Sequence, residues 1–542
     1  MKQSPPPPMR QLHGALTLLL WLSAAACKSG HYAPISAGTP SSEAPPTARL
    51  VFVTDLAGVV EPCGCTRNQL GGISHFAAWV TRERSRMPAM VIASAGPQFF
   101  TDPRLEGDSA DQARTKAVVL ARLMRDLDWA AFAPAGGDLA DGAEGLASLA
   151  RLSGAAALRS EDAVAPWATV SVRTVGALHV GFVGVSAAGN AAAAKAAQAA
   201  VRREVERAKA LGANVVVALA PVGRGEAKRL ADAVPELLAV VVGSAQATGE
   251  QNTTAPELER VGNVLIVQAA NHLQSIAVLD LTLDGKVEAG ALTPLSDGTG
   301  IELAASRASV ERRRDELRTK IASWERDPSV LPRDIEARRR DLADLEAELA
   351  RLAAARTHVV GSYYRIAVQE IRDNLGTDRT ADRELLSYYK AVNEHNRQTF
   401  ADRRPLVPSA DESGYVGGEA CAVCHAGPED VWSRTAHASA YATLQKGFKE
   451  FNLECVGCHV TGYEKPGGST VTHVDKLRNV QCESCHGPGS KHVLAPQVAN
   501  IVARPDPATC LDCHRPPHVE NFDAALRMAD ILGPGHGAPA QH

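Results

Sequence analysis

Large aromatic side chains are scarce in this chain of 542 residues, since phenylalanine, tyrosine and tryptophan together make up only 4%. An excess of one charge sign is also absent, because 57 lysines and arginines are balanced by 61 aspartates and glutamates. That balance leaves no strongly basic face, which excludes nucleic acid as an expected partner. Beyond the N-terminus, no apolar run approaches the roughly 20 residues that a transmembrane helix needs. The length nevertheless allows two to four domains.

The N-terminus has the layout of an export signal. A positively charged start precedes the apolar stretch of residues 14–26, which is too short to span a bilayer and predicts a signal peptide. Ala24 and Ala26 fit ordinary cleavage, whereas Cys27 directly after them fits the lipobox of a bacterial lipoprotein, which gives this otherwise unpaired cysteine a role. We expect residues 1–27 to be a signal peptide with a lipobox. The mature protein is then a lipoprotein on the periplasmic side of a bacterial membrane, anchored to the outer membrane.

Hydrophobic patterning divides the rest of the chain. Short β-branched runs alternate with amphipathic stretches, which predicts an α/β domain. Its expected strands are 50–54, 89–94, 179–185, 214–220, 238–243 and 263–270, and its expected helices are 108–127 and 190–210. Two heptad-like apolar series separated by "DPSVLP" then predict an antiparallel helical hairpin. The predicted parts are a flexible linker (28–47), the α/β domain (48–297), the hairpin (300–357), a connecting segment (358–413) and a C-terminal unit (414–538).

Eight of the eleven cysteines form four pairs in the C-terminal unit, and a histidine follows each pair at once. The motifs CAVCH, CVGCH, CESCH and CLDCH contain Cys421, Cys424, Cys455, Cys458, Cys482, Cys485, Cys510 and Cys513, followed by His425, His459, His486 and His514. Paired cysteines alone fit a disulfide, a zinc site or a redox dithiol. None of these explains a histidine after every pair, whereas covalently attached haem does.

The repeated CxxCH pattern has a geometric reason. Thiols at positions i and i+3 of a helical turn lie on one face, where they can form thioethers with the two vinyl groups of haem. The next residue then places its imidazole beneath the iron. Bacterial c-type haem is attached outside the cytoplasm, which agrees with the export signal. We therefore expect four covalently bound haem c groups in a multihaem cytochrome c domain of helices and loops.

The second axial ligands are expected to be mainly imidazoles. Met528 is the only methionine between residue 125 and the C-terminus, so at most one iron can have the His/Met pairing that raises its potential. The other histidines of this region are His437, His473, His492, His518, His536 and His542. A mainly bis-histidine domain is expected to have low potentials and to transfer electrons.

The segments YVGGEACAVCH, VWSRTAHASAYATL, CVGCHVTGYEKPGGST and QCESCHGPGSKH resemble the tetrahaem cytochrome c family of hydroxylamine-oxidising respiratory chains, over residues 415–537. The resemblance implies three distal ligands, namely His437, His492 and His536. It also implies that the iron bound to His459 is five-coordinate, although His473 in the following loop could close that open face. His518 and His542 are expected to be non-ligands.

The stretch VFVTDLAGVVEPCGCTRNQLGG resembles calcineurin-like metallophosphoesterases of the 5′-nucleotidase group, which implies a metallophosphoesterase-like α/β sandwich. That family holds two metal ions with histidine-rich motifs. Here Asp55 is the clear survivor and Asp138 a substitute, while Ala57 and Pro221 stand where histidines are expected. Two carboxylates cannot hold two ions about 3.5–4 Å apart. We therefore expect a retained scaffold without phosphatase chemistry.

Cys63 and Cys65 form a further pair in the same stretch. In an oxidising compartment they fit a disulfide or structural thiols, a redox-active pair supplied with electrons by the haems, or a metal site.

The whole sequence leads to three functional hypotheses. The first is an electron carrier with periplasmic redox partners, such as other cytochromes or quinol-linked complexes. The others are a multihaem oxidoreductase acting on a small nitrogen or sulfur compound at a five-coordinate haem, and a 5′-nucleotidase-like phosphohydrolase with an atypical metal site.

Overall fold

The computed structural model describes residues 46–542, except 64–68, 161–166, 187–189, 247–250, 329, 356–358, 517, 520–521, 533–535 and 537–542. The predicted signal peptide, Cys27 and most of the predicted linker lie outside this part of the chain. Residues 46–542 form one compact unit. Among the described helices, none combines the length and the apolar character needed to cross a bilayer.

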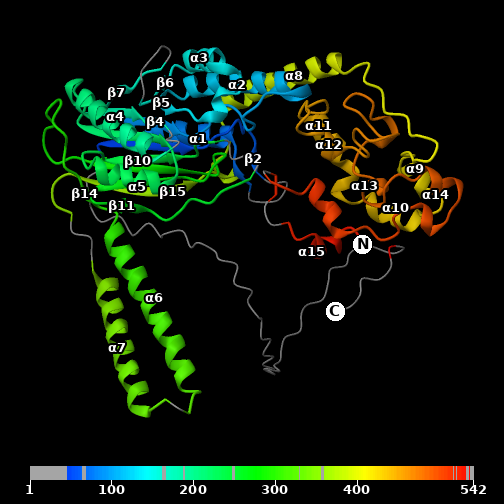
Figure 1. The fold of residues 1–542 in the computed structure, drawn as a ribbon. Helices are drawn as coiled ribbons and strands as arrows, with labels where there is room; N and C mark the ends of the chain where they lie inside the picture. Colours follow the sequence, from blue (N-terminus) through cyan, green and yellow to red (C-terminus); the bar gives the residue numbers. More distant parts are fainter. Residues whose placement is uncertain are drawn as a thin grey trace, which may run out of the picture. The chain divides into compact units, whose positions relative to one another are not determined.

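The α/β domain is built on two stacked sheets (Figure 1). The seven-stranded sheet has the order β14-β15-β13-β1-β4-β5-β6, and the six-stranded sheet has the order β11-β12-β10-β9-β8-β7. The strands are β1 Ala48–Thr54, β4 Met90–Ala95, β5 Trp129–Ala133, β6 Ala156–Ala157, β7 Val170–Val175, β8 Leu178–Gly184, β9 Val215–Pro221, β10 Ala239–Gly243, β11 Glu259–Val261, β12 Val264–Val267, β13 Ser275–Thr282, β14 Ser296–Asp297 and β15 Tyr363–Glu370. All six strands expected from the sequence are present, which confirms the α/β prediction.

Apolar residues on the facing sides of the two sheets form the central core. Phe52 and Leu279 of the first sheet and Phe182 and Val241 of the second belong to one buried cluster. The outer faces are covered by α1 (Ile73–Arg86), α2 (Ala110–Asp126), α3 (Gly142–Ser153) and α8 (Arg379–Thr399) on the seven-stranded sheet, and by α4 (Ala191–Ala210) and α5 (Arg224–Ala233) on the other. The parallel strands are rich in valine and alanine because both of their faces are covered.

The segment predicted as a connection contributes a strand and a helix to the α/β domain. β15 pairs antiparallel with β13 along its whole length, from Ser275 opposite Glu370 to Thr282 opposite Tyr363. Leu385 of α8 is buried in the core cluster on the outer face of the same sheet. The chain therefore leaves the sheet after β14, forms the hairpin and then returns to the sheet.

The helical hairpin consists of α6 (Ile301–Trp324) and α7 (Pro332–Ala354), which lie side by side (Figure 1). Arg318 forms an ion pair with Glu346, and Glu325 forms one with Arg339, each at 2.6 Å. From residue 318 to residue 325 the partner in α7 changes from residue 346 to residue 339, so the two helices run antiparallel. This confirms the predicted hairpin.

The C-terminal region consists of short helices and loops. Its helices are α9 Gly418–Ala422, α10 Ala426–Trp432, α11 Ala440–Lys446, α12 Val456–His459, α13 Cys482–His486, α14 Ser490–Leu494 and α15 Ala524–Met528. Its apolar cluster is small, with Tyr441, Leu444, Val456, Val460 and Val474 buried in it. A core of this size does not stabilise more than a hundred residues by itself, so the region needs covalent links or a bound group.

Candidate haem-binding sites

Each CxxCH motif occupies a short helical turn. The second motif begins at the N-cap of α12, the third is in α13, the first spans the end of α9, and the fourth begins inside a 3-10 turn at Pro507–Asp512. In the first and fourth motifs the histidine N–H donates to the carbonyl of the first cysteine, four residues back, at 2.9 Å. This turn brings the two thiols of a motif to one face. All eight cysteines are free thiols.

Thiols of different motifs lie next to one another. The thiol of Cys482 raises the pKa of Cys421, and the thiol of Cys458 raises the pKa of Cys513, so the two thiols of each pair lie close together. The first motif therefore lies beside the third, and the second beside the fourth. Within the described residues, no three or more His, Cys, Asp or Glu side chains are grouped so that they can hold a metal ion.

Two pairs of imidazoles have the spacing of axial ligands. The ring centres of His425 and His492 are 6.4 Å apart with 22° between their planes, and those of His437 and His514 are 6.1 Å apart with 46°. Two imidazoles on opposite sides of one metal ion, with metal–nitrogen bonds of about 2 Å, place their ring centres about 6 Å apart. Each pair joins the histidine of one motif to a histidine outside the motifs. These residues therefore fit a bis-histidine haem.

His536 lies close to a third motif histidine. Burial lowers the pKa of His536, and the positive charges that His486 and His425 can carry lower that pKa further. The sequence position of His536, more than twenty residues after the last motif, gives no indication of this contact. His536 therefore lies within electrostatic range of His486 and His425.

Backbone carbonyls fix the tautomers of several of these histidines. Nδ1 of His459 donates to the carbonyl of Ala440, and Nδ1 of His486 donates to that of Val502, each at 2.7 Å. A carbonyl oxygen can only accept, so Nδ1 carries the proton and Nε2 is left for an iron. Such second contacts orient metal-bound histidines and raise their basicity.

His473 is held away from an axial position. Its Nε2 lies 2.7 Å from Nη1 of Arg404, which can only donate, and its Nδ1 lies 3.0 Å from the hydroxyl of Thr472. Both ring nitrogens are therefore already hydrogen-bonded to the segment that follows α8 and to the loop itself. The five-coordinate iron at His459, and the alternative in which His473 supplies its second ligand, both stay predictions.

Exposed apolar side chains surround the attachment motifs. Val423 is 83% exposed, Leu494 is 86% exposed and Val498 is 73% exposed. Val423 lies inside the first motif, and Leu494 follows His492 by two residues. Apolar surface in water is unfavourable by about 25 cal/mol per Å² unless another group covers it. A porphyrin can cover such surface. The exposed apolar side chains around the motifs are therefore a second feature, besides the imidazole pairs, that fits bound haem.

Glu483, inside the third motif, links two loops through a buried carboxylate. Its side chain is only 2% exposed. Oε2 accepts the N–H of Gly417 at 2.8 Å, Oε1 accepts that of Gly489 at 2.7 Å, and both oxygens lie within 3.1 Å of the Val416 nitrogen. The segment before the first motif is thereby tied to the loop after the third motif. The sequence gives no indication of this role for Glu483, because nothing in the CxxCH pattern specifies the residues between the cysteines.

The two surviving carboxylates of the α/β domain are hydrogen-bonded to the protein itself. Asp55 accepts the N–H of Ser244 at 2.7 Å and its hydroxyl at 3.1 Å. Asp138 accepts the N–H groups of Gln98 and Phe99, each at 2.8 Å, and that of Ala135 at 3.2 Å. Both are buried. Hydrogen-bond donors of the protein thus use part of the acceptor capacity of both carboxylates.

Burial also makes these two groups harder to ionise, which gives a pH prediction. Burial raises the pKa of Asp55 to about 6 and that of Asp138 to about 7, against the opposing effect of their hydrogen bonds. In the unfolded chain both titrate near pH 4, so the folded state holds extra protons between about pH 4 and 7. We expect the stability of the α/β domain to fall as the pH rises through this window, by about 1.4 kcal/mol per unit of raised pKa. Urea unfolding at several pH values checks this, and Asp138→Asn is expected to flatten the slope.

His272 is a buried histidine beside Asp55 that the sequence analysis missed. Its side chain is fully buried, its N–H donates to the carbonyl of Asp55 at 2.9 Å, and its Nδ1 donates to Asn252 Oδ1 at 2.9 Å. It follows the predicted strand at 263–270, and residues at the carboxyl ends of parallel strands commonly face ligand sites. That position could have identified it.

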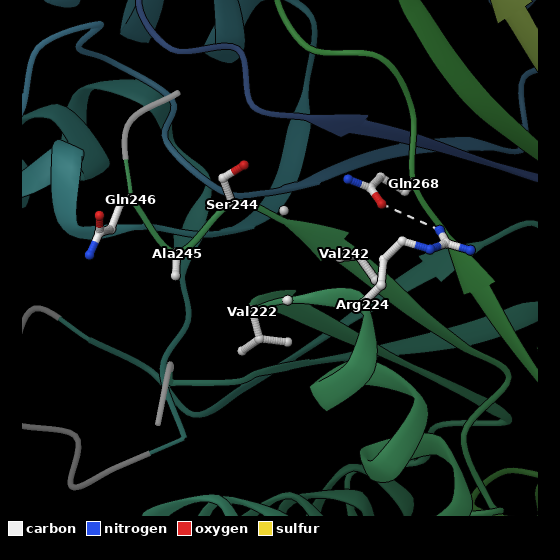
Figure 2. A pocket seen from close by; sticks show the side chains of 9 residues that line it. Val222, Arg224, Val242, Ser244, Ala245, Gln246 and Gln268 are labelled. Atoms are coloured by element: carbon white, nitrogen blue, oxygen red, sulfur yellow. Dashed lines mark hydrogen bonds between the residues drawn. The ribbon is translucent and has the colours of Figure 1, made fainter. Parts of the chain in front are cut away.

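A cavity of about 410 Å³ opens at the carboxyl ends of β9 and β10 (Figure 2). Ser244, Gln246 and Gln268 line it, and Arg224 Nη1 donates to Gln268 Oε1 at 3.3 Å. Arg224 Nη2 also donates to Glu259 at 2.9 Å. The lining residues are neutral apart from this paired arginine.

The backbone of Cys63 forms the short strand β2 (Pro62–Cys63), which pairs with β3 (Leu70–Gly71). The side chain of Cys63 and all of Cys65 lie outside the described residues. Their predicted roles therefore stay predictions.

Residues 420–487 match the family described as "Cytochrome c554 and c-prime". Over 96 residues, or 15% of the chain, the sequence is 34% identical to "Cytochrome c-554" of Nitrosomonas europaea, and it spans 41% of that relative's length. The resemblance stated for the C-terminal region is thus confirmed, and this family implies covalently bound haem c.

Among solved structures, the chain is similar to a 5′-nucleotidase precursor from Thermus thermophilus, with 16% identity, a TM-score of 0.40, and 77% of this chain and 69% of that one covered. It is also similar to the sulfate thiohydrolase SoxB of the same organism, with 15% identity, a TM-score of 0.37, and 47% of this chain and 56% of that one covered. We transfer no metal, substrate or active-site residue from similarities of this size.

Proposed function

We propose that this chain is an exported tetrahaem c-type cytochrome that transfers electrons in the periplasm. The observation that carries the proposal is the pairing of His425 with His492 and of His437 with His514 at the spacing of axial ligands. In each pair one ring follows a cysteine pair and supplies the proximal ligand, while the other supplies the distal ligand. His486 and His536 form the third pair in this proposal.

Haem c, when bound through the eight cysteines, supplies reversible one-electron chemistry. The protein's own residues decide how that chemistry is used. Imidazoles on both faces of three irons keep substrates away from them, which favours electron transfer over catalysis. The sulfur contacts between Cys421 and Cys482 and between Cys458 and Cys513 bring attachment points of different motifs together, which favours transfer between sites.

Purified from a host that attaches c-type haem, the protein is expected to carry four haem groups by intact mass and to bind one carbon monoxide per chain when reduced. Three pairs of imidazoles leave no position for carbon monoxide, whereas the site at His459 leaves one. Colourless, zinc-loaded protein would contradict the proposal. Binding of carbon monoxide at all four sites would show that the imidazole pairs are not ligands.

The position of His473 supports a second function. Because Arg404 and Thr472 hold both of its ring nitrogens, the face opposite His459 stays open to a small nitrogen or sulfur compound. An oxidoreductase acting there would lose turnover when carbon monoxide occupies that face. A pure electron carrier would still pass electrons to an added acceptor cytochrome.

For the α/β domain we propose a scaffold that has lost its metal site. The hydrogen bonds from Ser244 to Asp55 and from three backbone N–H groups to Asp138 support this. The fall of stability between about pH 4 and 7 is therefore expected to be the same with and without added Mn²⁺, since bound Mn²⁺ would favour the ionised carboxylates and remove that fall. Phosphohydrolase activity in the wild-type protein that Asp55→Ala abolishes would overturn this part of the proposal.

The cellular placement is also a proposal. It rests on the apolar stretch of residues 14–26 and on Cys27, which the sequence places in a lipobox-like context. The proposed partners are periplasmic cytochromes or quinol-linked complexes, and the proposed anchor is a lipid on Cys27 in the outer membrane. A redox role of Cys63 and Cys65 remains part of the proposal.

A further inference from the structure

Two helices of the α/β domain hold the segment that precedes the second attachment motif. Gln112 of α2 donates to Asn452 Oδ1 and accepts the N–H of Leu453, each at 3.0 Å. Asn396 of α8 donates to Gln112 Oε1 at 3.0 Å and to the carbonyl of Phe451 at 2.9 Å. Gln112, Asn396 and Asn452 are each at most 2% exposed. We call these three residues the polar latch; it fixes residues 451–453 directly before Cys455.

Two reciprocal ion pairs flank the polar latch. Lys116 of α2 binds Glu454 at 2.6 Å, and Glu61, just before β2, binds Lys449 at 2.9 Å. Each pair has one member in the α/β domain and one in the haem-binding region, and the signs are opposite in the two pairs. The hydroxyl of Tyr389 also donates to Glu61 at 2.5 Å, which fixes that carboxylate.

These four charges act on the same atom. Burial raises the pKa of the Cys455 thiol, Glu454 and Glu61 raise it further, and Lys449 and Lys116 lower it. Cys455 is the first attachment point of the motif that ends in His459. The side chain of Lys116 is only 8% exposed and that of Lys449 is 23% exposed, so water screens these two charges incompletely. Glu454 is 48% exposed and Glu61 is 45% exposed, so water screens the two negative charges more strongly. The protein thus places two positive and two negative charges around one attachment site, with a sum of zero.

We propose that the α/β domain sets the reduction potential of the iron at His459, through Glu61 and Lys116 held in place by the polar latch. This inference rests on the proposed haem at the second motif and assigns a role to a domain without a metal site. A negative charge near a haem stabilises the oxidised iron and lowers its potential, and a positive charge raises it. Because the two residues have opposite signs, the domain can shift this potential in either direction by losing one of them.

The test is a redox titration of the full-length holoprotein, following the optical and paramagnetic resonance signals of the five-coordinate iron. Glu61→Gln removes a negative charge and is expected to raise that potential, whereas Lys116→Met removes a positive charge and is expected to lower it. The potentials of the other haems are expected to shift less. Arg122→Met is the matched control, because Arg122 also lies on α2 but pairs with Glu384 within the α/β domain; it is expected to leave the potential unchanged.

A structural defect and an electrostatic effect give different results. Loosened contacts shift the potential in the same direction in both variants, whereas the proposal requires opposite directions. The exchanged pair Lys116→Glu with Glu454→Lys is expected to restore the wild-type potential. Shifts of the same sign, or none, with four haems still attached would overturn this inference and leave the proposed function standing. Absence of haem from the second motif of the wild-type protein would overturn both.

Discussion

Replacement of His492 by alanine is expected to raise carbon monoxide binding from one to two molecules per reduced chain. In the proposed function His492 is the distal ligand opposite His425, and the two rings are 6.4 Å apart. Its loss opens one face of that iron and converts it from a low-spin to a high-spin state. Optical titration with carbon monoxide measures the stoichiometry, and paramagnetic resonance measures the change of spin state.

The matched control is His473→Ala. This histidine also lies between CxxCH motifs, but Arg404 and Thr472 hold its ring nitrogens. Its loss is expected to leave the stoichiometry at one. If His473→Ala instead creates a new binding site and His492→Ala does not, the assigned distal ligands are wrong.

Replacement of Glu483 by glutamine is expected to destabilise the haem-binding region by about 3 kcal/mol, because a buried charged acceptor loses its hydrogen bonds to backbone N–H groups. The amide nitrogen of glutamine is itself a donor. It would face the N–H of either Gly417 or Gly489, which the carboxylate now binds at 2.8 and 2.7 Å. The segment before the first motif would then separate from the loop after the third. Thermal or denaturant unfolding followed by haem absorbance measures the loss.

Glu419→Gln is the control for this change. Glu419 lies two residues after Gly417 and is exposed, so the same chemical substitution there is expected to leave the unfolding midpoint unchanged. Equal midpoints for Glu483→Gln and the wild-type protein would show that the carboxylate does not hold the two segments together.

The chemistry of the attachment sites follows from the sequence because it is local. A cysteine, a second cysteine three residues later and a histidine next to it meet on one helical turn whatever the rest of the fold does. The strands of the α/β domain are equally local, since valine-rich runs such as 214–220 fit buried parallel strands. The antiparallel hairpin also follows from the spacing of apolar residues within each helix and the short break between them.

The distal histidines do not follow from local sequence. Spacing alone does not say which of the remaining histidines are second axial ligands, and only the family resemblance selected His437, His492 and His536. The tertiary structure gave this choice physical support by pairing His437 with His514 and His425 with His492, and by holding His473 elsewhere. Neither pattern nor resemblance indicated Glu483, because its partners are backbone N–H groups that no sequence motif encodes.

The sequence by itself determined which residues can attach haem and which residues form strands and helices, because these depend on neighbours within a few positions. Only the tertiary structure decided that β15 returns to the sheet of β13, and that Glu61 and Lys116 lie beside the second attachment motif. Those contacts join residues from about 80 to nearly 400 positions apart. They depend on how whole sheets and helices pack, and no short-range periodicity contains that information.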